Sequence, residues 1–142
     1  MNAVECGAAC LAMVLTYHGR RTTVAECAAQ VGVGRDGQSA TQLATAARAE
    51  GLAVRAFSLE PADIRLLPVP VIAHWEFNHF VVVERWSSAG VDVVDPAIGR
   101  RRMSIEEFDH GFTGVVLVCE PGEAFVARRS GRRSWRGYLR TY

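Results

Sequence analysis

The sequence lacks the features of a membrane-spanning or exported chain. None of its apolar runs reaches the roughly 18 to 20 residues needed to cross a bilayer, and no signal peptide opens it. It also contains no internal repeat and no low-complexity segment. With 142 residues, of which 49% are hydrophobic and 22% charged, the chain is long enough to bury a core of its own. We therefore expect one soluble domain in the cytoplasm.

The cysteine pattern argues against two further classes of protein. The chain has no C-x-x-C or H-x-x-x-H pair, so it lacks the ligand spacing of a structural zinc site. Without an export signal, a disulfide framework is not expected either. The four cysteines are Cys6, Cys10, Cys27 and Cys119, and the last three lie in apolar periodic stretches typical of buried thiols. Cys6 and Cys10 share one helical face, which leaves open a redox or metal protein that uses this pair.

The formal net charge of +1 is unevenly distributed. Residues 126–142 contain six arginines and no acidic residue, so residues 1–125 carry a net charge of −5. A basic tail of this kind could contact anionic lipid or nucleic acid, or be a solvated linker. Because the body of the chain is acidic, we do not expect it to bind nucleic acid. We predict a folded domain at 1–125 followed by a basic linker or tail at 126–142.

Apolar periodicity predicts that the first half of the chain is helical. Two capping-box patterns, Thr23-x-x-Glu26 and Ser39-x-x-Gln42, mark the starts of the second and third helices. A proline at the first turn, Pro61, favours a short fourth helix. The helices predicted on these grounds span 5–18, 23–31, 40–50 and 61–67.

The second half is typical of β-strands. Apolar and β-branched runs separated by turn residues predict strands at 52–58, 69–76, 79–86, 91–94, 100–103 and 114–120. Phe77-Asn78 is predicted to be a tight hairpin turn, and Ser104-x-x-Glu107 to cap a short helix before the last strand. A helical N-terminal half packed on an antiparallel meander is an α+β arrangement.

This arrangement gives one cysteine two candidate partners. Cys6 lies at the start of the first helix, where the helix dipole and the unpaired backbone N–H groups favour thiolate over thiol. His79 begins a predicted strand and Asp95 ends the next, and adjacent antiparallel strands lie about 5 Å apart, so the two are expected to be neighbours. A Cys, His and Asp set has the parts of a cysteine hydrolase. The remaining histidines, predicted to be structural or exposed, are His18, His74 and His110.

Three segments in the same order carry a resemblance to a known family. They are Glu5-Cys6-Gly7-Ala8-Ala9-Cys10-Leu11-Ala12-Met13, Phe77-Asn78-His79-Phe80-Val81-Val82 and Asp95-Pro96-Ala97-Ile98-Gly99, followed by Phe108-x-x-x-Phe112-Thr113-Gly114. On these residues, from Met1 to about Phe125, the chain resembles the C39 peptidase family. Its members are papain-like cysteine proteases, usually found at the N-terminus of bacteriocin and lanthipeptide ABC exporters.

The resemblance implies a peptidase that removes the leader from a secreted peptide precursor by cutting after a double-glycine-type pair. It implies that Cys6 is the nucleophile, that His79 is the general base and then acid, and that Asp95 orients His79. It implies no cofactor and no metal. The expected partners are a precursor with an amphipathic leader and the transmembrane and ATPase domains of an exporter, at the cytoplasmic face of the bacterial cell membrane. An apolar groove would hold the leader helix, with candidate walls in the helical half of the chain and near Trp75 and Trp86.

One residue of the family pattern has no counterpart in the chain. The family usually has a glutamine six residues before the nucleophile, where it donates to the oxyanion, and that position precedes Met1. None of the glutamines present, Gln30, Gln38 and Gln42, occupies it. The backbone N–H of Cys6 remains as an expected oxyanion donor. Either the start of the chain has been placed or cut one or more residues too late, or the enzyme works with a poorer oxyanion hole. Losing one such donor costs on the order of 100- to 1000-fold in turnover, so the alternative function is a catalytically weak or inactive leader-binding module.

Overall fold

The computed structural model describes residues 3–31, 40–76, 79–123 and 125. Within these ranges the chain forms helices and a single six-stranded sheet. No helix in these ranges is long and apolar enough to cross a membrane. The predicted turn Phe77-Asn78 and the basic tail at 126–142 lie outside the described residues.

The helices follow the sequence predictions closely. They are α1 (Ala3–Tyr17), α2 (Val24–Val31), α3 (Ala40–Ala49), the 3₁₀ helix η1 (Pro61–Leu66) and α4 (Ile105–Gly111). α1 begins two residues earlier than predicted, which makes Cys6 the fourth residue of the helix. The predicted cap of α2 is confirmed, since Thr23 Oγ1 accepts a 3.1 Å hydrogen bond from the backbone N–H of Glu26. The predicted cap of α3, Ser39, lies outside the described residues.

The strands also lie close to their predicted residue ranges, but the last strand has a different place in the sheet from the one that a meander would give it. They are β1 (Leu52–Ser58), β2 (Val71–Trp75), β3 (His79–Ser87), β4 (Gly90–Asp95), β5 (Gly99–Met103) and β6 (Phe112–Pro121). The sheet order is β1-β6-β2-β3-β4-β5, and all neighbours are antiparallel. The predicted meander is therefore right for β2 to β5 and wrong for β6, which pairs with β1 and β2 instead of extending the edge.

The composition of β6 explains its central place. Its residues from Val116 to Cys119 are all buried, alternately toward the two faces of the sheet. A strand buried on both faces must be covered on both faces, which an edge position beside β5 would not provide.

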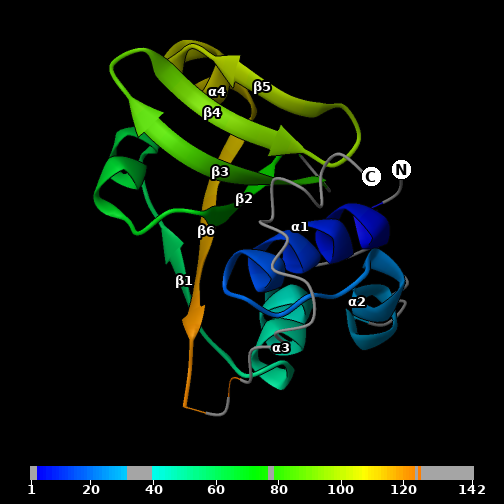
Figure 1. The fold of residues 1–142 in the computed structure, drawn as a ribbon. Helices are drawn as coiled ribbons and strands as arrows, with labels where there is room; N and C mark the ends of the chain where they lie inside the picture. Colours follow the sequence, from blue (N-terminus) through cyan, green and yellow to red (C-terminus); the bar gives the residue numbers. More distant parts are fainter. Residues whose placement is uncertain (1–2, 32–39, 77–78, 124, 126–142) are drawn as a thin grey trace.

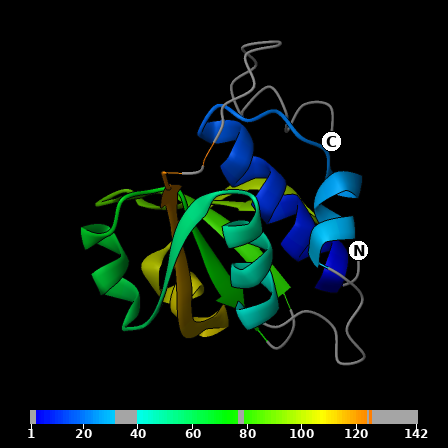
Figure 2. The same ribbon diagram turned by 90° about the horizontal axis from the view of Figure 1, so that it is seen from below.

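Helices cover the sheet on both faces, and each face has its own core. Figures 1 and 2 show α1, α2 and α3 on one face and η1 and α4 on the other. α1 is buried nearly all round, with residues 8–15 at most 1% exposed, because it packs against the sheet and against α2 and α3. On the opposite face the core is built around Phe108 of α4 and Ile64 of η1. We call these the α1 core and the α4 core.

The topology brings three chain segments to one end of the sheet. β3 begins and β4 ends there, because the two strands are antiparallel neighbours joined by a short turn. Figure 1 shows the N-terminal end of α1 at the same side of the molecule. This end therefore collects residues from the beginning, the middle and the later part of the chain.

The N-terminus of α4 has a complete capping box. Ser104 Oγ accepts a 3.1 Å hydrogen bond from the Glu107 backbone N–H, and Glu107 Oε1 accepts one of 3.2 Å from the Ser104 backbone N–H. We expect Ser104→Ala to lower the free energy of unfolding by about 1 kcal/mol, because the Glu107 N–H loses its side-chain acceptor. Urea unfolding with circular dichroism measures the loss, and an unchanged midpoint would contradict it.

Candidate active site

The predicted histidine and aspartate meet as the strand order requires. His79 is the first residue of β3 and Asp95 the last of β4, and His79 Nε2 donates to Asp95 Oδ1 at 2.7 Å. Asp95 is buried, with 7% of its surface exposed. Its Oδ1 also accepts a 2.9 Å hydrogen bond from the backbone N–H of Ala97 in the following turn. The carboxylate is thus held in place by its own turn as well as by the imidazole.

The N–H of Ala97 is a contributor that the sequence analysis did not single out. An Asp followed by proline and one further residue is a common Asx-turn pattern, so a signal for it was present in Asp95-Pro96-Ala97.

The nucleophile candidate lies on the other side of the imidazole. A hydrogen bond between His79 and the Cys6 side chain is the largest cause that raises the pKa of His79, to about 9 from an ordinary 6.5. Burial lowers this pKa, while the hydrogen bond to Asp95 and the negative charges of both neighbours raise it. The structure thus brings Cys6, His79 and Asp95 together in the order in which a thiol, a base and an orienting group are needed.

The two ring nitrogens have separate tasks. Because Nε2 is hydrogen-bonded to Asp95, the contact with Cys6 falls to Nδ1. A raised pKa keeps the imidazole protonated at neutral pH, and an imidazolium beside a thiol stabilises the thiolate. The arrangement can therefore form a thiolate–imidazolium pair, the reactive state of a cysteine nucleophile. The oxyanion role of the Cys6 backbone N–H stays a prediction.

Access to the thiol is narrow. Cys6 has 0% exposed surface, whereas the His79 side chain is 23% exposed and the Asp95 side chain 10%. The imidazole is thus the member of the set that solvent reaches most. No sequence pattern predicts this difference in exposure.

The other cysteines, Cys10, Cys27 and Cys119, are buried. Burial raises the pKa of Cys10 well above its ordinary value, with smaller contributions from the charges of Cys6, Asp95 and Cys119. Burial also raises the pKa of Cys27 and of Cys119 to about 12. Their prediction as buried small hydrophobic residues is confirmed, since each is at most 3% exposed. A redox or metal role for Cys6 and Cys10 gains no support, because Cys10 remains a neutral thiol.

The remaining histidines have other contacts. His18 Nε2 lies 3.1 Å from the backbone oxygen of Cys119, and burial lowers its pKa. His74 Nδ1 lies 2.8 Å from Thr113 Oγ1, and His110 is exposed on α4. Their prediction as structural or exposed residues is confirmed.

The two tryptophans proposed as groove walls belong mainly to the α4 core. The Trp75 and Trp86 rings lie 5.2 and 5.5 Å from the ring of Phe108, centroid to centroid. They are partly buried on the sheet face opposite α1. Both indoles therefore lie on the opposite face of the sheet from Cys6, and the leader groove stays a prediction.

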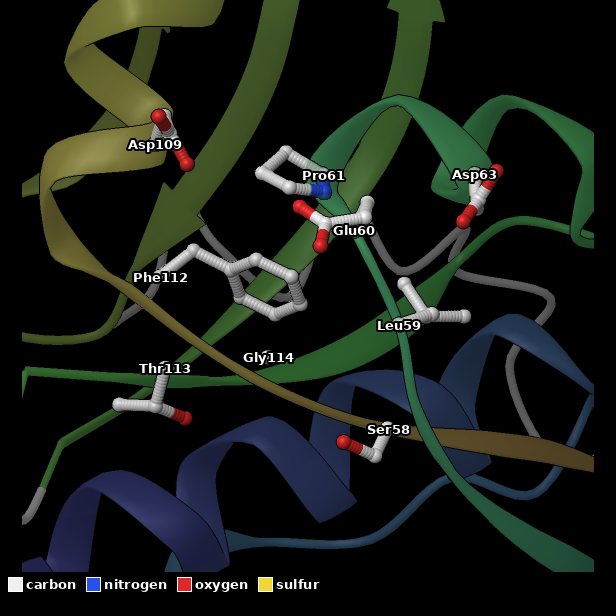
Figure 3. A pocket seen from close by; sticks show the side chains of 9 residues that line it. All are labelled: Ser58, Leu59, Glu60, Pro61, Asp63, Asp109, Phe112, Thr113 and Gly114. Atoms are coloured by element: carbon white, nitrogen blue, oxygen red, sulfur yellow. The ribbon is translucent and has the colours of Figure 1, made fainter.

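A separate acidic pocket of about 560 Å³ opens between η1, the end of α4 and the start of β6. Figure 3 shows the Phe112 ring turned toward Glu60 and Pro61, with the carboxylate of Asp109 nearby. None of the predicted catalytic residues lines this pocket. Within the described ranges no group of three His, Cys, Asp or Glu side chains is arranged to hold a metal ion.

Known proteins are similar to this chain in sequence. The chain is 37% identical over 124 residues to the colicin V secretion/processing ATP-binding protein CvaB of Escherichia coli, covering 87% of this chain and 18% of that protein. It is 32% identical over 123 residues to the lactococcin-G-processing and transport ATP-binding protein LagD of Lactococcus lactis, with 82% and 18% covered. The chain thus spans about a fifth of the length of these relatives.

Solved structures agree in fold. A double glycine motif protease from an AMS/PCAT transporter, crystallised with its leader peptide, superposes with a TM-score of 0.79 at 40% identity, covering 85% of this chain and 87% of that one. The peptidase domain of Streptococcus ComA, a bi-functional ABC transporter, gives a TM-score of 0.77 at 25% identity, with 85% and 94% covered. The predicted α+β, papain-like fold is confirmed. The family model described as the peptidase C39 family matches residues 1–124, and the chain is therefore a cysteine peptidase domain that belongs to the peptidase C39 family.

Proposed function

We propose that this domain removes the leader from a secreted peptide precursor by cutting after a double-glycine-type pair, through Cys6, His79 and Asp95. The observation that carries the proposal is the His79 imidazole held between Cys6 and Asp95. Its support from known proteins is the likeness to a double glycine motif protease bound to a leader peptide. By the same likeness, we propose that it works with the transmembrane and ATPase parts of an ABC exporter, at the cytoplasmic face of the membrane.

The reaction follows from the charge state of the pair. The Cys6 thiolate attacks the carbonyl carbon of the second glycine, and the His79 imidazolium donates its Nδ1 proton to the leaving amine. This breaks the peptide bond and leaves the leader attached as a thioester. His79 Nδ1 then takes a proton from water, which attacks the thioester and releases the leader with a free carboxylate. Asp95 holds the ring through Nε2 in both steps.

The burial of Cys6 supports a preference for glycine. A thiol with 0% exposed surface is reached by a carbonyl only if the flanking residues need little room. Glycine has no Cβ, so a narrow approach admits it and rejects branched side chains by steric clash.

The direct test is cleavage of precursors that differ at the cut site. We expect a precursor with Gly-Gly to be cut between the second glycine and the next residue, as shown by the product masses. Replacing the second glycine of the precursor by valine should lower kcat/KM on the order of 100-fold, which corresponds to about 2.7 kcal/mol of lost transition-state binding. A matched precursor with valine four residues into the core is the control, and equal rates for all three would contradict the steric argument.

The leader-binding alternative is tested in the same reaction. Tight binding of the Gly-Gly precursor with no product at high enzyme concentration would favour a binding module. The proposal predicts product.

The orienting carboxylate should set the alkaline limit of activity. Because the hydrogen bond and charge of Asp95 raise the pKa of His79, Asp95→Asn should lower that pKa below about 9. We expect kcat/KM to fall about 100-fold, and its alkaline limb to move to lower pH as the imidazolium is lost earlier. Rates measured from pH 6 to 10 give both changes. Asp92→Asn, on the same strand but paired with Arg102, should leave the profile unchanged; an identical limb in Asp95→Asn would contradict the assigned role.

A further inference from the structure

We propose that Gly111, at the end of α4, is a positioning residue for catalysis. Because Gly111 has no side chain, it leaves the space that the Trp75 indole occupies, which we call the Trp75 seat, and it thereby fixes the point at which the strand bearing His79 begins. Gly111 lies on the face of the sheet opposite α1 and belongs to no predicted catalytic motif. The inference rests on the proposed role of His79.

Gly111 is a glycine because the Trp75 indole occupies the space of a side chain. A Cβ added there would lie 2.7 Å from Trp75 Cη2 and closer still to Cε2 and Cζ2. The indole has little freedom to move aside. Its ring lies 5.2 Å from that of Phe108, which is fully buried and also contacts Trp86 and Phe112. A substitution at Gly111 therefore has to displace Trp75 or the end of α4.

A backbone contact strengthens this seat. The Glu76 N–H donates a 2.6 Å hydrogen bond to the carbonyl oxygen of Gly111. Glu76 has a φ of 53°, a left-handed conformation that is uncommon outside glycine and that its surroundings have to hold in place. Gly111 thus fixes both the side chain of Trp75 and the backbone of the next residue.

The seat is connected to the catalytic histidine through the sheet. Trp75 is the last residue of β2, and its partner across the antiparallel pair is His79. On its other side Trp75 pairs with Phe112, the residue directly after Gly111, beyond an irregularity in the β2–β6 pairing. A shift of Trp75 is consequently passed to His79, whose Nε2 has to stay within 2.7 Å of Asp95.

The test is Gly111→Ala in the full chain. We expect kcat for the Gly-Gly precursor to fall on the order of 100-fold, the loss typical of about 1 Å of misplacement, with KM unchanged. We also expect the pKa of His79 to fall below about 9, since its hydrogen bonds to Cys6 and Asp95 lengthen. NMR titration of the imidazole measures this without activity. Absence of cleavage by the unmodified protein would count against the proposed function, whereas an unmoved titration would count against the role of Gly111.

A double-mutant cycle separates positioning from general destabilisation. Trp75→Leu removes the indole that a Cβ would strike, so Gly111→Ala should change kcat less than twofold in that background. An equal loss with and without the indole would overturn the proposal. Ser104→Ala, at the other end of the same helix, is the control and should lower the unfolding midpoint with kcat unchanged. If Gly111→Ala does not fold, Trp75→Phe tests the same seat and should lower both kcat and the pKa of His79; unchanged values would overturn the proposal.

Discussion

Cys6→Ala is expected to abolish cleavage of a Gly-Gly precursor, by on the order of 10⁶-fold in kcat, while leader binding stays within about twofold. The thiolate is the atom that bonds to the carbonyl carbon, and alanine offers none. Removing a buried sulfur leaves a small cavity, so the fold is retained. Mass spectrometry measures residual product, and fluorescence anisotropy of a labelled precursor measures binding.

Cys10→Ala is the matched control for this experiment. Cys10 lies one turn further along α1, is equally buried, and its raised pKa keeps it a thiol. We expect its replacement to leave kcat unchanged. Activity that survives in Cys6→Ala but disappears in Cys10→Ala would move the nucleophile to Cys10.

The meeting of His79 and Asp95 could be predicted because it depends on local chain geometry. A short turn between two antiparallel strands forces the start of one beside the end of the other, and their 2.7 Å contact is the result. The joining of Cys6 to this pair could not be derived in the same way. No local pattern states which face of the sheet a helix covers, so only the resemblance placed Cys6 beside His79.

Non-local packing accounts for the features that the sequence did not reveal. The insertion of β6 between β1 and β2 depends on pairing between segments about 60 residues apart, such as Val54 with Cys119. The burial of Cys6 and the contact of Gly111 with Trp75 have the same origin. A glycine in the last turn of a helix is read from sequence as a stop signal, although here an indole is what requires it.

His79 is expected to control both the rate and the pH dependence of stability. His79→Gln removes the group that protonates the leaving amine and activates water, so kcat should fall on the order of 10⁴-fold or more. His110→Gln, on the exposed side of α4, is the control and should retain full activity. Cleavage by His79→Gln within tenfold of the unmodified rate would exclude His79 as the acid and base.

The same variant should change how stability depends on pH. The pKa of His79 is raised in the folded state to about 9 from an ordinary 6.5, so folding favours the protonated form. Its contribution is complete below about pH 6.5 and is lost as the pH rises through 9. A shift of this size corresponds to on the order of 3 kcal/mol for the imidazole taken alone, and the measured loss is smaller to the extent that Cys6 supplies the proton on folding. Urea unfolding at pH 6 and pH 9.5 should show this loss in the unmodified chain and a smaller one in His79→Gln. An equal loss of unfolding free energy in the two proteins would mean that the imidazole does not carry its proton in the folded state. That result would contradict the thiolate–imidazolium pair.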